Sequence, residues 1–378
     1  MNDFDNYQGV GQVSKWLFVC AGMIAIMVMI GGITRMTESG VSITEWNLVS
    51  GMIPPLHHQD WLALYTKYQN TPQFRQINPD MTVEQFQTIF WWEWIHRLWG
   101  RLIGLVFVVP LLWFAWKNRL PSTLFLSLAI LFVLGALQGY VGWWMVQSGI
   151  VDQPWVSPIR LTVHLGFALL LFGMTVWIGL SLWRGVSPTK FSSKAKSALA
   201  CKFLLLMIFF TILLGGMTAG SHAGLVYNQF PLMGESWLPV DYWNRTESFL
   251  TNALSNRTAI QFHHRLAAEI TVTLVILFGG YIFVKRRHQL YIRRVSGLFV
   301  LAGMMQFGLG VVTLVYGLPI VLASLHQLGA LVLFLIGIVL THLLSTGEPP
   351  KLRRFSDERR PQQVRHAGTK RTDRPAGG

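Results

Sequence analysis

The stretch WLFVCAGMIAIMVMIGGIT, residues 16–34, contains no charged side chain. A run of about 20 apolar residues is long enough to cross the hydrocarbon core of a bilayer as a helix. The stretch ends in GGIT, residues 31–34, and this ending returns as GGMT at residues 215–218. These residues therefore predict a membrane-spanning helix and indicate that it is repeated later in the chain.

The rest of the chain has the same apolar character. Hydrophobic residues make up 52% of the sequence and charged residues only 13%, whereas soluble domains carry about 25% charged residues. The composition predicts an all-α integral membrane protein with eight transmembrane helices. The seven further spans that we expect are 95–116, 122–146, 160–183, 199–219, 260–284, 295–316 and 319–345.

Matches between the two halves of the chain extend the repeat. Residues 96–98 (HRL) return at 264–266, and His164 matches His326. Because each unit has four spans, both units enter the membrane in the same direction. We expect two tandem four-helix bundles related by a pseudo-two-fold axis along the membrane normal. The predicted division is an N-terminal half (1–190), a C-terminal half (191–345) and a disordered basic cytoplasmic tail (346–378).

The net charge of +14 follows a membrane pattern and does not indicate nucleic-acid binding. Most Lys and Arg residues fall on the side that holds both termini and the even-to-odd connections. By the positive-inside rule that side is cytoplasmic and contacts lipid headgroups. The N-terminal residues lack the arginines of a mitochondrial transit peptide, so we expect a bacterial inner membrane. Cys20 and Cys201 lie inside spans and predict no disulfide or metal pair.

Four histidines occupy repeat-matched positions, namely His96, His164, His264 and His326. His96 and His264 are expected to open their helices, and His164 and His326 to lie in the first turns of theirs. All four then lie at one depth near the outer face. Two imidazoles on neighbouring helices of one bundle can bind the iron of a haem from both sides. Zinc fits less well because no further ligand completes a tetrahedral set, and a hydrogen-bonded packing role stays open for any single histidine.

The two halves differ beside these histidines. Glu93 lies three residues before His96 and shares its helix face, whereas Gln261 occupies that place in the second half. A carboxylate beside one site predicts acid–base chemistry in the first half and electron transfer in the second. The alternative for Glu93 is an acid at a helix N-terminus. Arg97 and Arg265 either pair with a haem propionate or extend to lipid headgroups.

The first outer loop, residues 35–93, is long and rich in aromatic side chains, so we expect it to cap the first site. Residues 31–46, GGITRMTESGVSITEW, which join the first span to this loop, together with the following Pro54-Pro55, resemble the first-loop signature of the haem A synthase family. The stretch EWIHR at 93–97 resembles the family's Glu-x-x-His motif. The stretches QFHHR at 261–265 and SLHQLGA at 324–330 resemble its second-half ligand motifs. The branch without a first-loop cysteine pair is the most similar.

This resemblance implies the oxidation of the C8 methyl group of haem O to a formyl group, which gives haem A for cytochrome oxidase assembly. It implies that His264 and His326 hold a haem b, and that His96 and His164 hold the substrate haem O. It also implies that Glu93 is catalytic. The expected scheme has two successive hydroxylations, and electrons leave through haem b to an acceptor that the residues do not identify. Metabolic logic makes a haem O synthase, a farnesyltransferase, the expected donor of substrate; the oligomeric state stays open.

Two other classes of protein also fit part of the pattern. A membrane electron-transfer cytochrome with two b haems explains the four histidines but not the Glu93 and Gln261 difference. A transporter with parallel repeats explains the duplication and predicts a colourless protein. The haem content of the purified protein separates the three interpretations.

Overall fold

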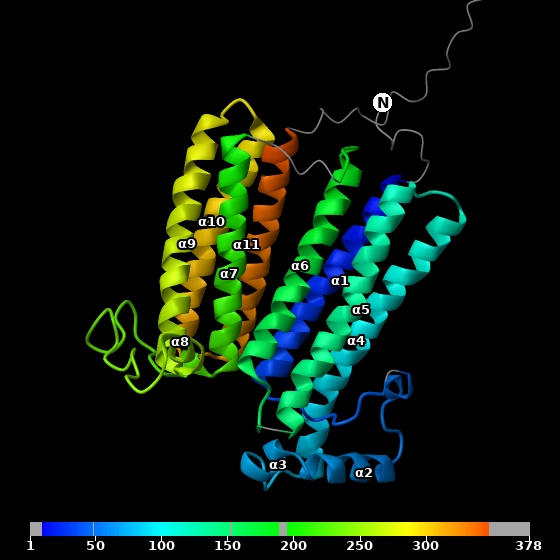
Figure 1. The fold of residues 1–378 in the computed structure, drawn as a ribbon, viewed down its shortest axis with the longest axis vertical. Helices are drawn as coiled ribbons and strands as arrows, with labels where there is room; N and C mark the ends of the chain where they lie inside the picture. Colours follow the sequence, from blue (N-terminus) through cyan, green and yellow to red (C-terminus); the bar gives the residue numbers. More distant parts are fainter. Residues whose placement is uncertain (1–9, 48, 152, 189–194, 348–378) are drawn as a thin grey trace, which may run out of the picture. The chain divides into compact units, whose positions relative to one another are not determined.

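The computed structural model describes residues 10–47, 49–151, 153–188 and 195–347. In this part of the chain eight helices are long and apolar enough to cross a membrane, which confirms the predicted all-α membrane fold (Figure 1). The only β pairing within it is an isolated bridge between Met233 and Ser236. The long helices are α1 (Val10–Met36), α4 (Val83–Trp116), α5 (Ser122–Val151), α6 (Pro158–Trp183), α7 (Lys196–Gly220), α9 (Arg257–Lys285), α10 (Leu290–Val315) and α11 (Ile320–Thr346).

Two long connections contain the short helices. The first connection, residues 37–82, joins α1 to α4, and the second connection, residues 221–256, joins α7 to α9. Both lie at the same end of the long helices, which we call the loop end (Figure 1). The first holds η1 (Ser50–Met52), α2 (His58–Gln69) and α3 (Pro72–Gln76), and the second holds η2 (Ala223–Leu225) and α8 (Phe249–Ser255).

Each set of four long helices packs as a ring. In the first, α1 contacts α4 and α6, while α5 contacts α4 and α6; in the second, α7 contacts α9 and α11, while α10 contacts α9 and α11. The rings meet through α1 with α11, α6 with α7, and α6 with α11. The axis and the division at residue 190 stay predictions, and the predicted tail falls almost entirely on residues 348–378, outside the described residues.

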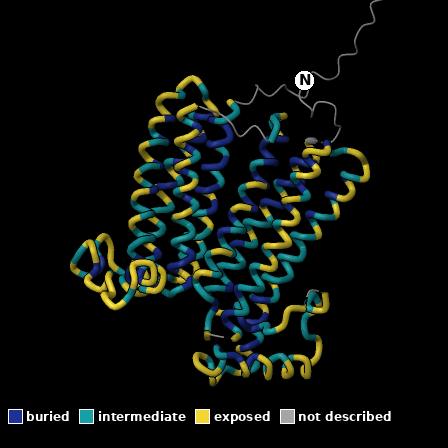
Figure 2. Tube along the Cα trace, in the orientation of Figure 1, coloured by how far each residue is buried: buried dark blue, intermediate teal, exposed yellow. Residues whose placement is uncertain are grey.

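Helices α6 and α11 form the centre of the described part. In their most apolar stretches 61% and 56% of the residues are buried, against at most 28% in the other six helices (Figure 2). Small side chains allow the close approach of neighbours: Gly179 of α6 lies against Phe18 of α1, and Ser14 donates to the Gly179 carbonyl at 2.9 Å. The outer helices leave their apolar sides exposed, as helices in contact with lipid do.

Helix α4 begins twelve residues before the predicted span, at Val83. Its first turn is capped reciprocally, because Gln85 N donates to the Thr82 hydroxyl and Thr82 N donates to the Gln85 amide oxygen. The residues that follow bury one side at helical spacing, namely Phe86, Ile89, Phe90 and Glu93. The span predicted from hydropathy began too late because polar residues alternate with the aromatic ones in these turns, which lowers their mean hydropathy.

The extra length of α4 supports the first connection. Phe86 stacks on Tyr68 of α2 with ring centroids 5.2 Å apart, and both side chains are fully buried. Phe74 of α3 meets Tyr68 edge-on at 5.7 Å. Aromatic pairs of this kind stabilise a cluster beyond the burial of their area. The first connection is therefore a packed cap on the loop end of α4.

Candidate functional site

Three of the four repeat-matched histidines lie near the loop end of their helices. His164 and His326 lie in the second turns of α6 and α11, as predicted, whereas His264, which was expected to open its helix, is the eighth residue of α9. His96 does not open its helix, because α4 starts at Val83 and the histidine lies well inside it. The prediction was wrong there for the reason given above, the capped amphipathic turns before residue 95.

The histidines of each half come from opposite corners of a ring and not from neighbouring helices. In the first ring α5 and α1 each lie between α4 and α6, and in the second α10 and α7 each lie between α9 and α11. The imidazoles of His96 and His164 pack against α1 and α5 of the first ring, and those of His264 and His326 pack against α7 and α10 of the second. Each pair therefore faces the interior of its own ring, the region in which helical bundles hold cofactors.

Every one of the four imidazoles lies against a helical glycine of an adjacent helix. An ideal Cβ at Gly31 would lie 3.3 Å from His96 Nε2, and one at Gly142 would lie 2.9 Å from His164 Cε1. In the second ring the Cβ at Gly215 would lie 3.0 Å from His264 Cε1, and at Gly310 2.7 Å from His326 Cε1. At Gly142 and Gly310 a Cβ would force the imidazole to move, and at Gly31 and Gly215 it would be a tight contact, so each histidine lies in a cradle formed by a glycine.

Two of the four histidines keep a buried ring nitrogen that the protein does not satisfy. Nδ1 of His164 and Nδ1 of His264 are buried without a hydrogen-bond partner, and a buried polar atom of this kind is costly unless a bound group satisfies it. Gln306 lies beside His326, with its amide nitrogen 3.0 Å from Nδ1 and 2.9 Å from the backbone oxygen, and Gln138 donates to the His164 oxygen at 3.0 Å.

These features fit a haem better than a bare metal ion. Among the described residues no three His, Cys, Asp or Glu side chains gather to hold a metal ion. Two opposed imidazoles in an apolar ring match the axial ligation of haem iron, which takes its other four ligands from the macrocycle. The donor set therefore supports the predicted pairs, His96 with His164 and His264 with His326.

Glu93 is buried and connects α4 to the first connection. Its Oε2 accepts from Ser42 Oγ at 2.8 Å and from Ile43 N at 2.8 Å, and its Oε1 accepts from Arg97 Nη2 at 2.6 Å. All three partners donate, which is the arrangement that an ionised carboxylate accepts. The position inside α4 excludes the alternative of an acid at a helix N-terminus.

Gln261 makes the corresponding connection in the second half. Its Oε1 accepts from Tyr227 N at 3.2 Å, and its Nε2 donates to the backbone oxygens of Tyr227 and Gly224 at 2.9 and 3.2 Å. Tyr227 is the repeat counterpart of Ile43, so the same backbone N–H is held in both halves. The acid in the first half and the amide in the second thus accept a hydrogen bond from the same backbone position of their connections.

The two arginines differ in how far the protein satisfies them. Arg97 donates to Glu93 and to the backbone oxygens of Ile43 and Glu45, at 2.6 to 2.7 Å. Arg265 donates to the backbone oxygens of Pro231 and Leu232, while its Nη1 is buried without a partner. Arg97 is thus committed to the first connection, and Arg265 keeps a donor available for an anion.

Two glutamates of the first connection, Glu38 and Glu45, have partners other than the histidines of the pairs. Glu38 Oε1 lies 3.3 Å from His222 Nε2, and this hydrogen bond lowers the pKa of Glu38. Glu45 pairs with Lys67 at 2.7 Å, which lowers the pKa of Glu45. His222 stands at the repeat position of Glu38, so the repeat contained a signal for this contact between the halves.

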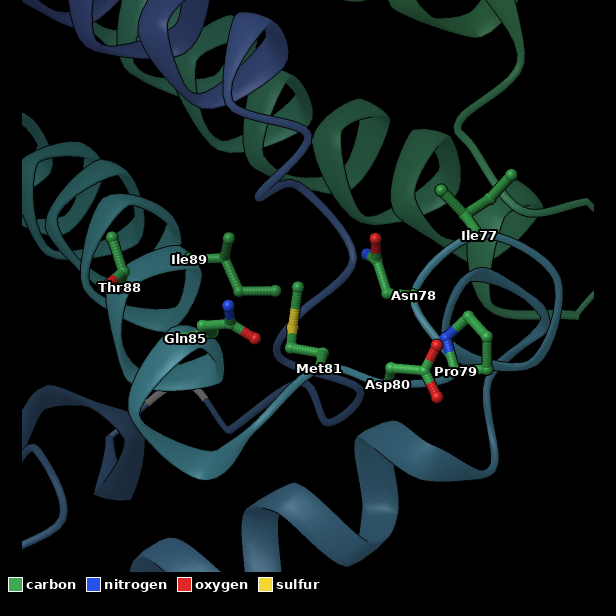
Figure 3. A pocket seen from close by; sticks show the side chains of 8 residues that line it. All are labelled: Ile77, Asn78, Pro79, Asp80, Met81, Gln85, Thr88 and Ile89. Atoms are coloured by element: carbon green, nitrogen blue, oxygen red, sulfur yellow. The ribbon is translucent and has the colours of Figure 1, made fainter.

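An open hollow of about 540 Å³ lies beside the first turns of α4 (Figure 3). Met81, Gln85 and Ile89 line one side of it and Asn78 another, with Asp80 as its one titratable group. None of the four histidines and no atom of Glu93 lines it. The hollow is therefore separate from the histidine pairs.

The chain is similar to known proteins over most of its length. The family described as cytochrome oxidase assembly protein matches residues 14–338. The haem A synthase of Nitrosospira multiformis is 41% identical over 336 residues, which cover 88% of this chain and 93% of the relative. The haem A synthase of Rhodospirillum centenum is 41% identical over 341 residues, which cover 90% of this chain and 90% of the relative. That of Caulobacter sp. strain K31 is 42% identical over 323 residues, which cover 85% of this chain and 92% of the relative.

Proposed function

This chain belongs to the haem A synthase family, and on that premise we propose that it oxidises the C8 methyl group of haem O to the formyl group of haem A. It is accordingly an oxidoreductase that serves cytochrome oxidase assembly. The observation that carries the proposal is the asymmetry at one helix position. Both halves hold a histidine pair against glycines, but only the first places a buried carboxylate, Glu93, three residues before a histidine of its pair.

The first pair, His96 and His164, is assigned to the substrate haem O. The second pair, His264 and His326, is assigned to a resident haem b, which would supply one-electron redox chemistry. The unpartnered Nη1 of Arg265 supports a contact with a propionate in the second half. In the first half, the three hydrogen bonds of Arg97 favour a different role for this arginine, the support of Glu93 and of the first connection.

The residues around the first pair bind, orient and shield the substrate. The packed first connection covers the loop end of α4, and the glycine cradles fix the two imidazoles. Two successive hydroxylations of the methyl group give a gem-diol, which loses water to form the aldehyde. Written with water as the oxygen donor, conversion of the methyl group and one water molecule to a formyl group releases four protons and four electrons, and the electrons leave through the second half to an acceptor.

Glu93 is the residue proposed to act at the methyl carbon. A carboxylate that accepts from Ser42, Ile43 and Arg97 is held in one place. Such a group stabilises positive charge that develops near it in a site of low dielectric, and it accepts protons released by the methyl carbon. Gln261 cannot do either, which assigns the chemistry to the first half.

The proposal extends to the surroundings of the protein. The eight apolar helices support a multi-pass membrane protein, and the charge distribution supports a bacterial inner membrane with cytoplasmic termini and histidine pairs near the outer face. Haem O is itself a membrane-soluble product of a farnesyltransferase, so a haem O synthase in the same membrane is the proposed donor.

The haem content of the purified full-length protein tests the proposal. A host that also expresses a haem O synthase is used, and the haems are extracted with acid–acetone and identified by liquid chromatography and mass spectrometry. Haem b together with haem A, or with a hydroxylated haem O, is the expected result. Haem b alone at two per chain would overturn the proposal in favour of an electron-transfer cytochrome, and a colourless protein would favour a transporter.

A further inference from the structure

The two adjacent glycines at the loop end of α1 face different halves of the protein. Gly31 lies against His96, as described above, with a Cβ position 3.3 Å from Nε2. Gly32 faces α11 of the other half, where a Cβ would overlap the side-chain amide of Gln327. Gln327 directly follows His326 in the chain. One dipeptide of α1 therefore contacts the first histidine pair and the neighbour of the second.

The second half repeats this arrangement with one change. Gly215 of α7 lies against His264, with a Cβ position 3.0 Å from Cε1, and Gly216 lies against Leu165, with a Cβ position 3.0 Å from Cδ2. Leu165 directly follows His164, as Gln327 follows His326. The contact between the two halves is therefore made by a leucine at Gly216 and by an amide at Gly32.

The polar side carries a hydrogen bond between the halves. Gln327 Nε2 donates to the backbone oxygen of Val28 in α1 at 2.6 Å. Val28 lies one turn before Gly32 on the same helix, so the amide contacts α1 at two successive turns. A directional bond to the backbone restricts both the rotation and the sliding of α1 more than the contact of a leucine does, and in a lipid environment water does not compete for it.

We propose that Gln327 is a positioning residue for the first histidine pair, although it stands in the second half. By holding α1 at Val28 and Gly32 it sets how closely Gly31 approaches His96, and it thereby sets the orientation of that imidazole toward the substrate haem. The inference rests on the proposed function, because it assigns the substrate to His96 and His164. It adds a residue of α11 to the machinery that binds the substrate.

The test replaces the amide while keeping its length. Gln327→Met retains the volume over Gly32 but has no N–H to donate. Leu165→Met is the matched control at the repeat position. Both full-length proteins are purified from the host that makes haem O, their haems are quantified, and the low-spin ferric signals of the two bis-histidine sites are recorded by electron paramagnetic resonance.

The expected effect of Gln327→Met appears in the half opposite to the substitution. The haem held by His96 and His164 should fall several-fold in occupancy and show a shifted or broadened signal. The haem b next to residue 327 should keep its occupancy and signal, which also reports that the protein is folded. Gly32→Ala, which inserts a Cβ into the amide from the other helix, should give the same selective loss, and Leu165→Met should change neither site.

Two results would overturn the inference. The first is a Gln327→Met protein whose first site has the occupancy and signal of the unchanged protein. The second is loss of haem b at His264 and His326 with the first site intact, since this would make Gln327 a support for its own neighbour. If the protein without substitutions binds neither haem O nor haem A, the proposed function is overturned, and this inference is overturned with it.

Discussion

The first and second connections are held to their bundles from the same helix position by different chemistry. Glu93 accepts from Ile43 N and is neutralised by Arg97, whereas Gln261 accepts from Tyr227 N and donates to two backbone oxygens. An amide is sufficient to hold the connection. The carboxylate in the first half therefore adds a buried negative charge that the fold does not require, and a charge of this kind is typical of a functional site.

The largest expected effect comes from removing one histidine of either pair. His96→Leu should abolish binding of haem O and haem A and leave haem b in place, whereas His264→Leu should abolish haem b. Haem extraction and quantification per chain measure both. His263→Leu is the matched control, because His263 is adjacent in sequence but contacts Tyr242 at 3.1 Å instead. Equal loss of both haems in both variants would contradict separate sites.

Exchange of the acid and the amide tests the comparison directly. Glu93→Gln should preserve an acceptor for Ile43 N, as Gln261 does for Tyr227 N, but should lower the rate of haem A formation by about 100-fold or more, the scale of a lost acid–base or charge-stabilising group. Haem occupancy should stay unchanged. Gln261→Glu should leave the activity of the folded protein unchanged. It should lower the free energy of unfolding by about 1–3 kcal/mol, because a carboxylate would face two carbonyl oxygens. Full activity of Glu93→Gln would remove Glu93 from the chemistry.

The glycine cradles predict a smaller effect of similar size in both halves. Gly310→Ala and Gly142→Ala would place a Cβ 2.7 and 2.9 Å from the Cε1 atoms of His326 and His164. We expect a loss of about 1–3 kcal/mol in stability, the typical cost of overpacking. Gly308→Ala and Gly139→Ala are matched controls, since nothing lies within 4 Å of their Cβ positions. Thermal unfolding in detergent measures the difference, and equal behaviour of cradle and control variants would show that the histidines can shift freely.

The contact between Glu38 and His222 predicts the smallest effect. Because folding lowers the pKa of Glu38, the stabilisation is present above the ordinary pKa of a glutamate and is lost as the pH falls through the lowered value. The Glu38 side chain is 43% exposed, so the contribution should be about 1 kcal/mol or less. Thermal unfolding of the unchanged protein and of Glu38→Gln should differ at pH 7, and the difference should shrink as the pH falls below the ordinary pKa of a glutamate. A difference that does not change with pH would assign the effect to packing.

Much of the site was predictable because the repeat marks it. The four histidines, Glu93 and Gln261 stand at matched offsets, and a matched polar residue in an apolar helix is costly unless it has a role. The partners of these residues were not predictable. Ser42 and Ile43 are distant in sequence from Glu93, and nothing in the first connection signals that its backbone N–H and hydroxyl point at α4. Gln327 was quoted only as part of a motif, since its contact with Val28 spans most of the chain.

The apolar runs, the duplication and the matched histidines were determined by the sequence alone, because hydrophobic length and repeat offset are local or linear properties of a chain. Tertiary structure decided three other matters. It extended α4 to Val83, since capping and aromatic packing on Tyr68 outweigh a low hydropathy. It placed each histidine pair on opposite corners of a ring, which depends on helix order in space. It also satisfied Arg97 and left Arg265 Nη1 unpartnered, because hydrogen bonds form with whatever backbone the folded connections bring within reach.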